Sequence, residues 1–192
     1  MLAGGKSRRL GRDKATAAIN GTSLIERVVE RLKPQTSRVL IVTSRDQLNL
    51  HADIDAEIIS DLYPDRGPLS GIYTGLMESH SSRNIVVACD MPLLNTALLN
   101  YMIKLSSDFD AVVPRLRKDR LEPLHAIYSE KCLSSMKLQL EAGKLEAYSF
   151  LNMVHVRYVD LAECQRFDPQ LLSFFNINRQ SDLIRAAGLC QP

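Results

Sequence analysis

The sequence predicts an α/β fold in which helices pack on a mostly parallel β-sheet. Short runs of β-branched residues alternate with segments whose apolar residues recur at helical spacing. This order is typical of parallel strands joined by right-handed crossovers. The chain has 192 residues, of which 45% are hydrophobic and 24% are charged, so it can bury one core. We therefore expect a single domain over residues 1–192.

Apolar runs mark the expected strands, because strands buried on both faces of a sheet carry few polar residues. Four buried parallel strands are expected at Ser37–Thr43, Ala56–Ser60, Arg83–Asp90 and Phe109–Pro114. Helices are expected between them at residues 24–32, 69–79 and 96–105. Ser23 and Glu26 make an S-x-x-E capping box for the first helix, and Asn95 or Thr96 caps the third.

The regular alternation fades after Pro114. The charged residues 115–120 and the short strand pattern after them predict a hairpin that leaves the main sheet and is able to line a second pocket. Residues 154–160 alternate like a strand. Residues 174–188 read as a strand-like piece that turns into a terminal helix.

Composition argues against several classes of protein. The net charge is +2 and the cations are spread along the chain except near its start, so we expect no nucleic-acid partner. Four cysteines stand far apart without a C-x-x-C pair, which argues against a zinc site or a disulfide framework and favours the cytoplasm. No apolar run reaches the roughly 18 residues of a membrane span, so we expect no membrane partner.

A glycine-rich, basic segment, "LAGGKSRRLGRDK", opens the chain at residues 2–14. Glycines such as Gly4, Gly5 and Gly11 let backbone N–H groups approach phosphate oxygens, and Lys14 would add a mobile charge. The spacing fits neither the Walker A motif nor G-x-G-x-x-G, which disfavours an ATPase or a dinucleotide enzyme. The alternative is a solvated basic turn without function.

Asp90 follows an apolar strand in "VVACDMPLL". Ligands of open α/β sheets bind beyond the carboxyl ends of the strands, where a carboxylate can hold Mg²⁺ together with substrate phosphates. The alternative is an Asp that caps the following turn. The glycine-rich segment and Asp90 together favour a site for a phosphorylated ligand.

Five motifs occur in one order along the chain: "LAGGKSRRLGRDK", "DLYPDRGPLSGI", "CDMPLL", "EPLHAIY" and "FFNIN". In this order they resemble the molybdenum cofactor guanylyltransferases, the MobA family of the nucleotide-diphospho-sugar transferase superfamily. The resemblance implies a three-layer, Rossmann-like fold of that type. It also implies that the N-terminal part binds the nucleotide and the C-terminal part binds the acceptor.

The implied reaction moves GMP from GTP to molybdenum-bearing molybdopterin, with Mg²⁺ as cofactor, and gives the guanine dinucleotide form of the cofactor and pyrophosphate. The implied catalytic residues are Lys14 and Asp90, and Asp90 holds the metal. The implied nucleotide-binding residues are Leu2, Ala3, Gly4, Gly5, Lys14, Asp61, Gly67, Pro68, Leu69 and Asp90, with Gly67–Gly71 as a turn over the nucleotide. Asn176 and Asn178 are implied to approach the acceptor. Transient contact with cofactor-delivery or molybdoenzyme proteins is also expected.

Two rival functions stay open. A cytidylyltransferase acting on the same pterin would be expected to open with L-A-A-G and to lack "GPLSG". A non-catalytic nucleotide-binding regulator is the other, although Asp90 and Lys14 weigh against it. Ser44 stands where family members often place an asparagine that reaches the base, which bears on guanine selectivity.

The family pattern places apolar residues ahead of L-A-G-G, and here Met1 alone precedes Leu2. We therefore expect either a start farther upstream or a short first strand, with an unfilled slot at the centre of the sheet. His125 is expected to be a hydrogen-bonded structural residue rather than a catalytic one. Cys89 is expected to be a small buried hydrophobe. Arg115 and Arg117 belong to a solvated run that an anionic pterin phosphate could also use.

Overall fold

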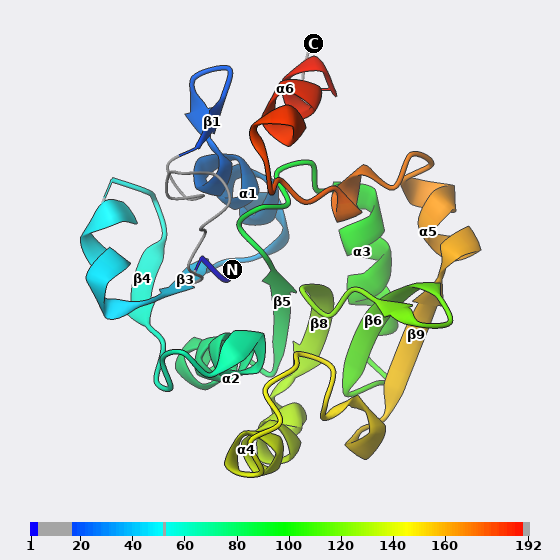
Figure 1. Cartoon of the computed structure of the whole chain (residues 1–192). Helices are drawn as coiled ribbons and strands as arrows, with labels where there is room; N and C mark the ends of the chain where they lie inside the picture. Colours follow the sequence, from blue (N-terminus) through cyan, green and yellow to red (C-terminus); the bar gives the residue numbers. More distant parts are fainter. Residues whose placement is uncertain (4–16, 52, 190–192) are drawn as a thin grey trace.

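A computed structural model describes residues 1–3, 17–51 and 53–189. The central sheet runs in the order β4 (Glu57–Ser60), β3 (Leu40–Thr43), residues 1–3, β5 (Arg83–Val87), β8 (His125–Ser129), β6 (Ala111–Arg117) and β9 (Val156–Asp160) (Figure 1). β3 pairs with β4 in parallel, and β6 pairs with β9 in parallel. β8 runs antiparallel to both of its neighbours, β5 and β6. The prediction of a mostly parallel sheet is therefore confirmed, with β8 and the short strand β7 (Arg120–Leu121), which pairs antiparallel with β6, as exceptions.

Residues 1–3 occupy the centre of the sheet. Leu2 forms parallel bridges to Val42 and Ala88, and its N–H donates to the carbonyl oxygen of Val87 at 2.9 Å. Ala3 N–H donates to the carbonyl oxygen of Val42 at 2.8 Å. Residues 1–3 therefore lie in the expected slot, beside Val42 and Ala88. A pocket of about 200 Å³ continues between β3 and β5, and Met1 and Leu2 form part of its lining.

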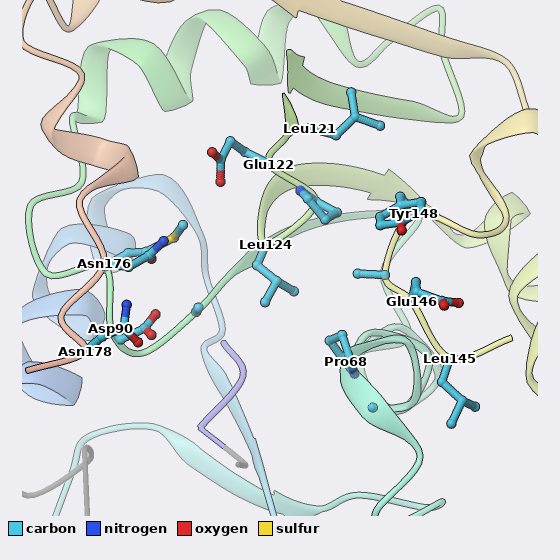
Figure 2. A pocket seen from close by; sticks show the side chains of 15 residues that line it. Pro68, Asp90, Leu121, Glu122, Leu124, Leu145, Glu146, Tyr148, Asn176 and Asn178 are labelled. Atoms are coloured by element: carbon cyan, nitrogen blue, oxygen red, sulfur yellow. The ribbon is translucent and has the colours of Figure 1, made fainter. Parts of the chain in front are cut away.

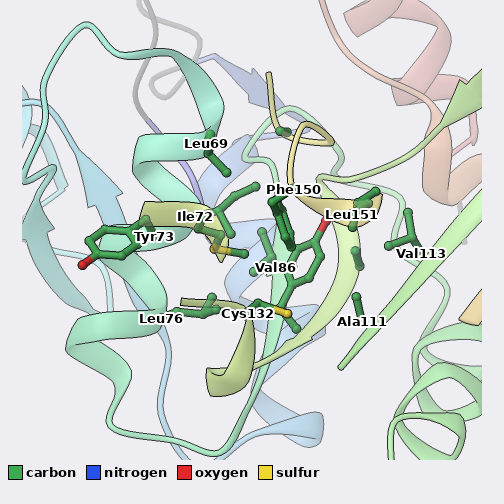
Figure 3. Close-up of a cluster of buried hydrophobic side chains, with 14 of the residues drawn as sticks. Leu69, Ile72, Tyr73, Leu76, Val86, Ala111, Val113, Cys132, Phe150 and Leu151 are labelled. Carbon is green, nitrogen blue, oxygen red and sulfur yellow. The ribbon is translucent and has the colours of Figure 1, made fainter. Parts of the chain in front are cut away.

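Helices cover both faces of the sheet. α2 (Gly67–Ser79) and α4 (Leu133–Glu141) pack on one face, where Ile72 and Leu76 lie in one cluster with Val86 (Figure 3). On the other face lie α1 (Leu24–Leu32), α3 (Thr96–Leu105) and α5 (Leu161–Phe167). Neighbouring strand residues point to opposite faces, as the period of two requires: Val86 faces α2, and Val87 belongs to the α1 cluster. The three-layer α/β prediction is confirmed.

The predicted helix caps are present. Ser23 Oγ accepts from Glu26 N–H, and the Glu26 carboxylate accepts from Ser23 N–H, which completes the capping box of α1. Asn95 Oδ1 accepts from the N–H groups of Ala97 and Leu98 at the start of α3. α2 begins at Gly67, two residues before the predicted start, so Gly67–Gly71 forms the first helical turn rather than a separate turn.

Several boundaries differ from the predictions. β3 begins at Leu40, β5 ends at Val87, and the edge strand β4 is only partly buried. β6 and β7 form a hairpin as predicted, but residues 125–129 do not leave the main sheet, because β8 pairs with both β5 and β6. Residues 175–179 make no strand, while the terminal helix α6 (Gln180–Leu189) is present. The other elements are β1 (Ala18–Ile19), β2 (Thr22–Ser23), and the 3₁₀ turns η2 (Lys33–Gln35), η3 (Arg45–His51), η4 (Glu130–Cys132), η5 (Leu151–Met153) and η6 (Leu172–Phe174).

Among the described residues, none of the helices has both the length and the apolar character needed to cross a membrane.

Candidate functional site

Asp90 lies just beyond β5, where the chain turns away from the sheet. Ala88 N–H donates to the carbonyl oxygen of Leu124 at 3.1 Å, and Cys89 N–H donates to that of Leu2 at 3.0 Å. The backbone carbonyl of Asp90 accepts from Ile177 N–H at 2.9 Å. The loop is therefore fixed to the first strand, to the segment before β8 and to the C-terminal segment, which holds Asp90 at the carboxyl end of the parallel strands.

Asn176 and Asn178 reach the same place from the segment between η6 and α6. Ile177 between them is fully buried in a cluster with Ile19, Leu24 and Leu183, while both asparagines are only partly buried. Asn178 N–H donates to Asp182 Oδ2 at 2.9 Å, which ties the segment to α6. Because side chains alternate along extended backbone, burying Ile177 turns the two asparagines toward Asp90, as Figure 2 shows.

The first turn of α2 forms another wall. Gly67 has φ +67°, a left-handed conformation that side chains other than glycine rarely adopt, and a Cβ there would lie 2.9 Å from the carbonyl oxygen of Leu145. Pro68 follows at the first helical positions, and Leu69 N–H donates to the Leu145 carbonyl at 3.3 Å. The helix end and the segment carrying Leu145 are thus in direct contact, with no space for a side chain at Gly67.

These segments enclose a pocket of about 600 Å³, within the usual size for small-molecule sites (Figure 2). Its floor and one wall are apolar, whereas the side with Asp90, Asn176 and Asn178 is polar. The described lining comprises Gly67, Pro68, Ala88, Asp90, Met91, Leu121, Glu122, Pro123, Leu124, Leu145, Glu146, Ala147, Tyr148, Asn176 and Asn178.

The described lining carries three carboxylates, those of Asp90, Glu122 and Glu146, and no basic side chain. Glu122 is the most recessed, and its burial raises the pKa of the carboxyl group, while the neighbouring Arg120 acts in the opposite direction. Such a lining is unfavourable for an anionic ligand unless cations accompany it. A phosphorylated ligand here would need a metal ion or basic groups from outside the described lining.

The lining can be tested against the implied Mg²⁺. No group of three or more His, Cys, Asp or Glu side chains arranged to hold a metal occurs in the described part of the chain. Mg²⁺ is usually bound by one or two carboxylates together with substrate phosphates and water, rather than by a cage of protein ligands. Asp90, with the amide of Asn178 beside it, fits this mode of binding.

The structure brings together Gly67, Pro68, Asp90, Asn176 and Asn178 from the predicted set. The other described members lie outside the pocket lining. Leu2 packs on Gly71 in the core, and Ala3 and Leu69 are buried. Gly4, Gly5 and Lys14 lie outside the described residues, as does Gly11.

Asp61 accepts hydrogen bonds from its own loop and from α2. Its Oδ1 accepts from Ser70 Oγ at 2.5 Å, from Thr74 Oγ1 at 2.9 Å and from Tyr63 N–H at 3.1 Å. The carboxylate therefore fastens the loop after β4 to α2. Whether it also contacts a nucleotide stays a prediction.

Two lining segments were not singled out as site residues from the sequence. In the first, Glu122 to Leu124 belong to the "EPLHAIY" motif, and Leu121 precedes them in the hairpin that is expected to line a pocket. Leu145 to Tyr148 follow α4 in a stretch without motif or clear periodicity, and only the fold brings them to Gly67.

His125 is buried as expected, but its environment differs from the hydrogen-bonded one that was predicted. It is fully buried with its ring edge-on to Phe174, and neither ring nitrogen has a hydrogen-bond partner among the described residues. Burial lowers the pKa of His125 to about 4, with the charge of Asp168 acting in the opposite direction. The ring is therefore neutral near pH 7 and supports the segment that carries Asn176.

Comparison with known proteins gives a consistent result. Residues 1–158 match the family described as MobA-like NTP transferase domain. A probable molybdenum cofactor guanylyltransferase of Pelotomaculum thermopropionicum is 35% identical over 191 residues, covering 100% of this chain and 92% of that protein. A molybdenum cofactor guanylyltransferase of Desulfosudis oleivorans is 35% identical over 190 residues, covering 97% and 92%.

Solved structures agree with these matches. Molybdopterin-guanine dinucleotide biosynthesis protein A from Archaeoglobus fulgidus superposes with a TM-score of 0.84 at 32% identity, covering 98% of this chain and 96% of that one. A 2-C-methyl-D-erythritol 4-phosphate cytidylyltransferase from Thermus thermophilus superposes with a TM-score of 0.72 at 12% identity, covering 98% and 96%, and shows the shared fold alone.

Proposed function

Because the chain belongs to the family of MobA-like NTP transferase domains, we propose that it transfers GMP from GTP to molybdenum-bearing molybdopterin. The products are the guanine dinucleotide form of the cofactor and pyrophosphate. The main support for this proposal is the pocket itself. Asp90, Asn176 and the start of α2 at Gly67 and Pro68 converge there, at the carboxyl ends of the strands.

In this reaction an oxygen of the acceptor's terminal phosphate attacks the α-phosphorus of GTP. The bond from that phosphorus to the bridging oxygen of the β-phosphate breaks, and pyrophosphate leaves. The transfer asks the protein mainly for positioning and for neutralisation of charge. The described lining is consistent with direct transfer, because it presents no Ser, Cys, Lys or His side chain to act as a covalent nucleophile.

Each end of the pocket has a role in this proposal. The amides of Asn176 and Asn178 hold the acceptor, and the carboxylate of Asp90 would hold Mg²⁺ beside them. When bound, the metal supplies positive charge that offsets the phosphates. The rigid backbone around Asp90, tied to Leu124 and Ile177, keeps that carboxylate in place.

The nucleotide is proposed to lie nearer to residues 1–3. Ala3 lies between the ends of β3 and β5, where the strand order of an open α/β sheet changes direction and ligands bind. Gly4, Gly5 and Lys14 are proposed to contact the phosphates there. The proposed contributions of Leu2 and Ala3 are their backbone positions, since the side chain of Leu2 packs on Gly71 and Ala3 is buried. Gly67, Pro68 and Leu69 would bound the nucleotide on the α2 side, and Asp61 would fix that helix.

We place the reaction in the cytoplasm, with transient contact to proteins that deliver or receive the cofactor. Cys132 and Cys164 are free and buried, which suits a reducing compartment. Burial raises the pKa values of the Cys132 and Cys164 thiols to about 12, so both stay protonated and unreactive near pH 7.

The proposed substrate is tested by thermal shift with GTP, CTP, ATP and UTP, each with and without Mg²⁺. We expect the largest rise in melting temperature with GTP and Mg²⁺, because a ligand that binds the folded state alone stabilises it. A larger shift with CTP would favour the cytidylyltransferase. If no nucleotide changes the melting temperature, the transferase proposal is wrong.

A further inference from the structure

Glu122 is a recessed carboxylate in the pocket wall to which neither the motifs nor the proposed reaction assigns a role. Its side chain is only 10% exposed, yet it belongs to the pocket lining. Burying a carboxylate away from water is costly unless hydrogen bonds or an opposite charge compensate. A charged group in this position therefore calls for partners that make its burial favourable.

The backbone and one oxygen of Glu122 are fully engaged. Its N–H donates to the carbonyl oxygen of Pro114 at 3.0 Å, and its carbonyl accepts from His125 N–H at 3.0 Å. Arg120 Nε donates to Oε1 at 2.8 Å. No hydrogen bond to Oε2 occurs among the described residues, and Figure 2 shows the carboxylate turned toward the side of the pocket that holds Asn176.

A carboxylate in this place selects for N–H donors. It would repel the phosphate of the acceptor, so it must face a part of the ligand that is rich in donors. A 2-amino-4-oxopyrimidine ring offers an amino group and a ring N–H side by side, and a carboxylate accepts from both. The pyrimidine ring of a pterin has this edge, and so does guanine.

The position of Glu122 favours the pterin. Glu122 lies between β7 and β8, on the side of β5 away from residues 1–3. The nucleotide is proposed to lie on the other side of β5, near residues 1–3. The apolar lining next to Glu122, formed by Leu121 and Leu124, suits the face of a flat heterocycle.

Resting on the proposed function, we infer that Glu122 determines the specificity of the acceptor site. Its carboxylate accepts hydrogen bonds from the amino and ring N–H groups of the acceptor's 2-amino-4-oxopyrimidine ring, while Asn176 and Asn178 hold the end nearer to Asp90.

The wild-type protein alone gives a first test. The test compares the binding of 6-hydroxymethylpterin with that of 6-hydroxymethyllumazine, in which an oxo group replaces the 2-amino group. Binding is measured by the quenching of each compound's own fluorescence. We expect the pterin to bind at least roughly tenfold more tightly, because the lumazine places a carbonyl against the carboxylate. Equal affinity, or no binding of the pterin, would overturn the inference.

Glu122→Gln tests the residue itself, with Glu146→Gln as the matched control. Glu146 is an exposed residue of the same pocket whose carboxylate points away from its centre. Glu122→Gln should abolish the preference for pterin over lumazine and raise the KM for molybdopterin roughly tenfold. The KM for GTP and the melting temperature should stay close to wild type, and Glu146→Gln should change neither preference nor KM.

The outcomes separate the inference from the function. If wild type transfers GMP but Glu122→Gln keeps its pterin preference, the inference fails and the function stands. If the KM for GTP rises instead, Glu122 contacts guanine and the inference is wrong. If wild type transfers no GMP to the acceptor, the proposed function itself fails.

Discussion

Asp90 lies in the loop that follows a short apolar strand. Its side chain reaches the pocket, and the backbone of the loop is held by three hydrogen bonds. The loop bonds to Leu2, Leu124 and Ile177. An acidic residue fixed in this way contributes little to the hydrophobic core, since it sits at the edge of the packed layers. Its value lies in the charge it presents to the ligand.

Asp90→Asn tests that role. The change keeps the shape of the side chain but removes the charge that would hold a divalent ion, so we expect GMP transfer to fall by roughly a hundredfold or more. The melting temperature should change by only a few degrees. Steady-state transfer assays at saturating Mg²⁺ measure the effect, and activity within tenfold of wild type would show that Asp90 is not the metal ligand.

His125 illustrates a residue whose burial affects stability rather than chemistry. Burial lowers its pKa in the folded state from the ordinary value of 6.5 to about 4. Between these two values the unfolded chain binds a proton that the folded chain does not. Stability from this residue is therefore complete above about pH 6.5 and is lost as the pH falls toward 4.

Replacing His125 by Leu removes this proton linkage while roughly keeping the volume. We expect wild type to lose about 3 kcal/mol of unfolding free energy relative to His125→Leu between pH 6.5 and pH 4, as the shift of the pKa to about 4 implies. Urea unfolding at several pH values measures the difference. If the difference in unfolding free energy between wild type and His125→Leu does not change with pH, His125 is not buried in its neutral form.

At the scale of elements, the start of α2 is coupled to the segment after α4. Gly67 combines a positive φ with the close approach of the Leu145 carbonyl, and Leu69 N–H donates to the same oxygen. Gly67 therefore allows two walls of the pocket, the start of α2 and the segment around Leu145, to contact each other directly.

Gly67→Ala should destabilise the protein by about 2–4 kcal/mol, because it adds left-handed strain to a steric overlap. Gly143→Ala is the matched control, since Gly143 has φ +74° with nothing within 4 Å of an added Cβ. The control should show the strain alone and cost less. Equal unfolding free energies in urea for the two variants would show that Leu145 simply moves aside.

The sequence predicted elements well where the signal was local. The capping box of α1 and the Asn95 cap were found because their donors and acceptors lie within three residues. The predicted start of α2 at residue 69 is two residues late. Glycine followed by proline is typical of a turn, whereas here the left-handed Gly67 is the first residue of the helix. Residues 125–129 are predicted to lie in a hairpin that leaves the sheet, and their place in the sheet as the antiparallel strand β8 is missed, because the sequence does not show which strands they pair with.

At the scale of the whole molecule, part of the site was predictable and part was not. Asp90, Asn176 and Asn178 stood in recognisable motifs, and the fold brings them to one pocket. Tyr148 and its neighbours stand in no motif that would predict a site. They line the pocket only because Leu145 packs on α2. The role of Asp61 in fastening α2 depends on Ser70 and Thr74 one helical turn apart, which the fold alone brings to it.

Guanylyl transfer in this pocket is the function that we propose for the chain. The most direct measurement incubates the purified chain with Mg²⁺, molybdenum-bearing molybdopterin and GTP labelled at the α-phosphate, and follows the dinucleotide product by chromatography, with CTP in a parallel reaction. We expect labelled molybdopterin guanine dinucleotide and one pyrophosphate per transfer, with GTP preferred over CTP. A labelled cytosine dinucleotide as the main product, or no dinucleotide from either nucleotide, would contradict this proposal.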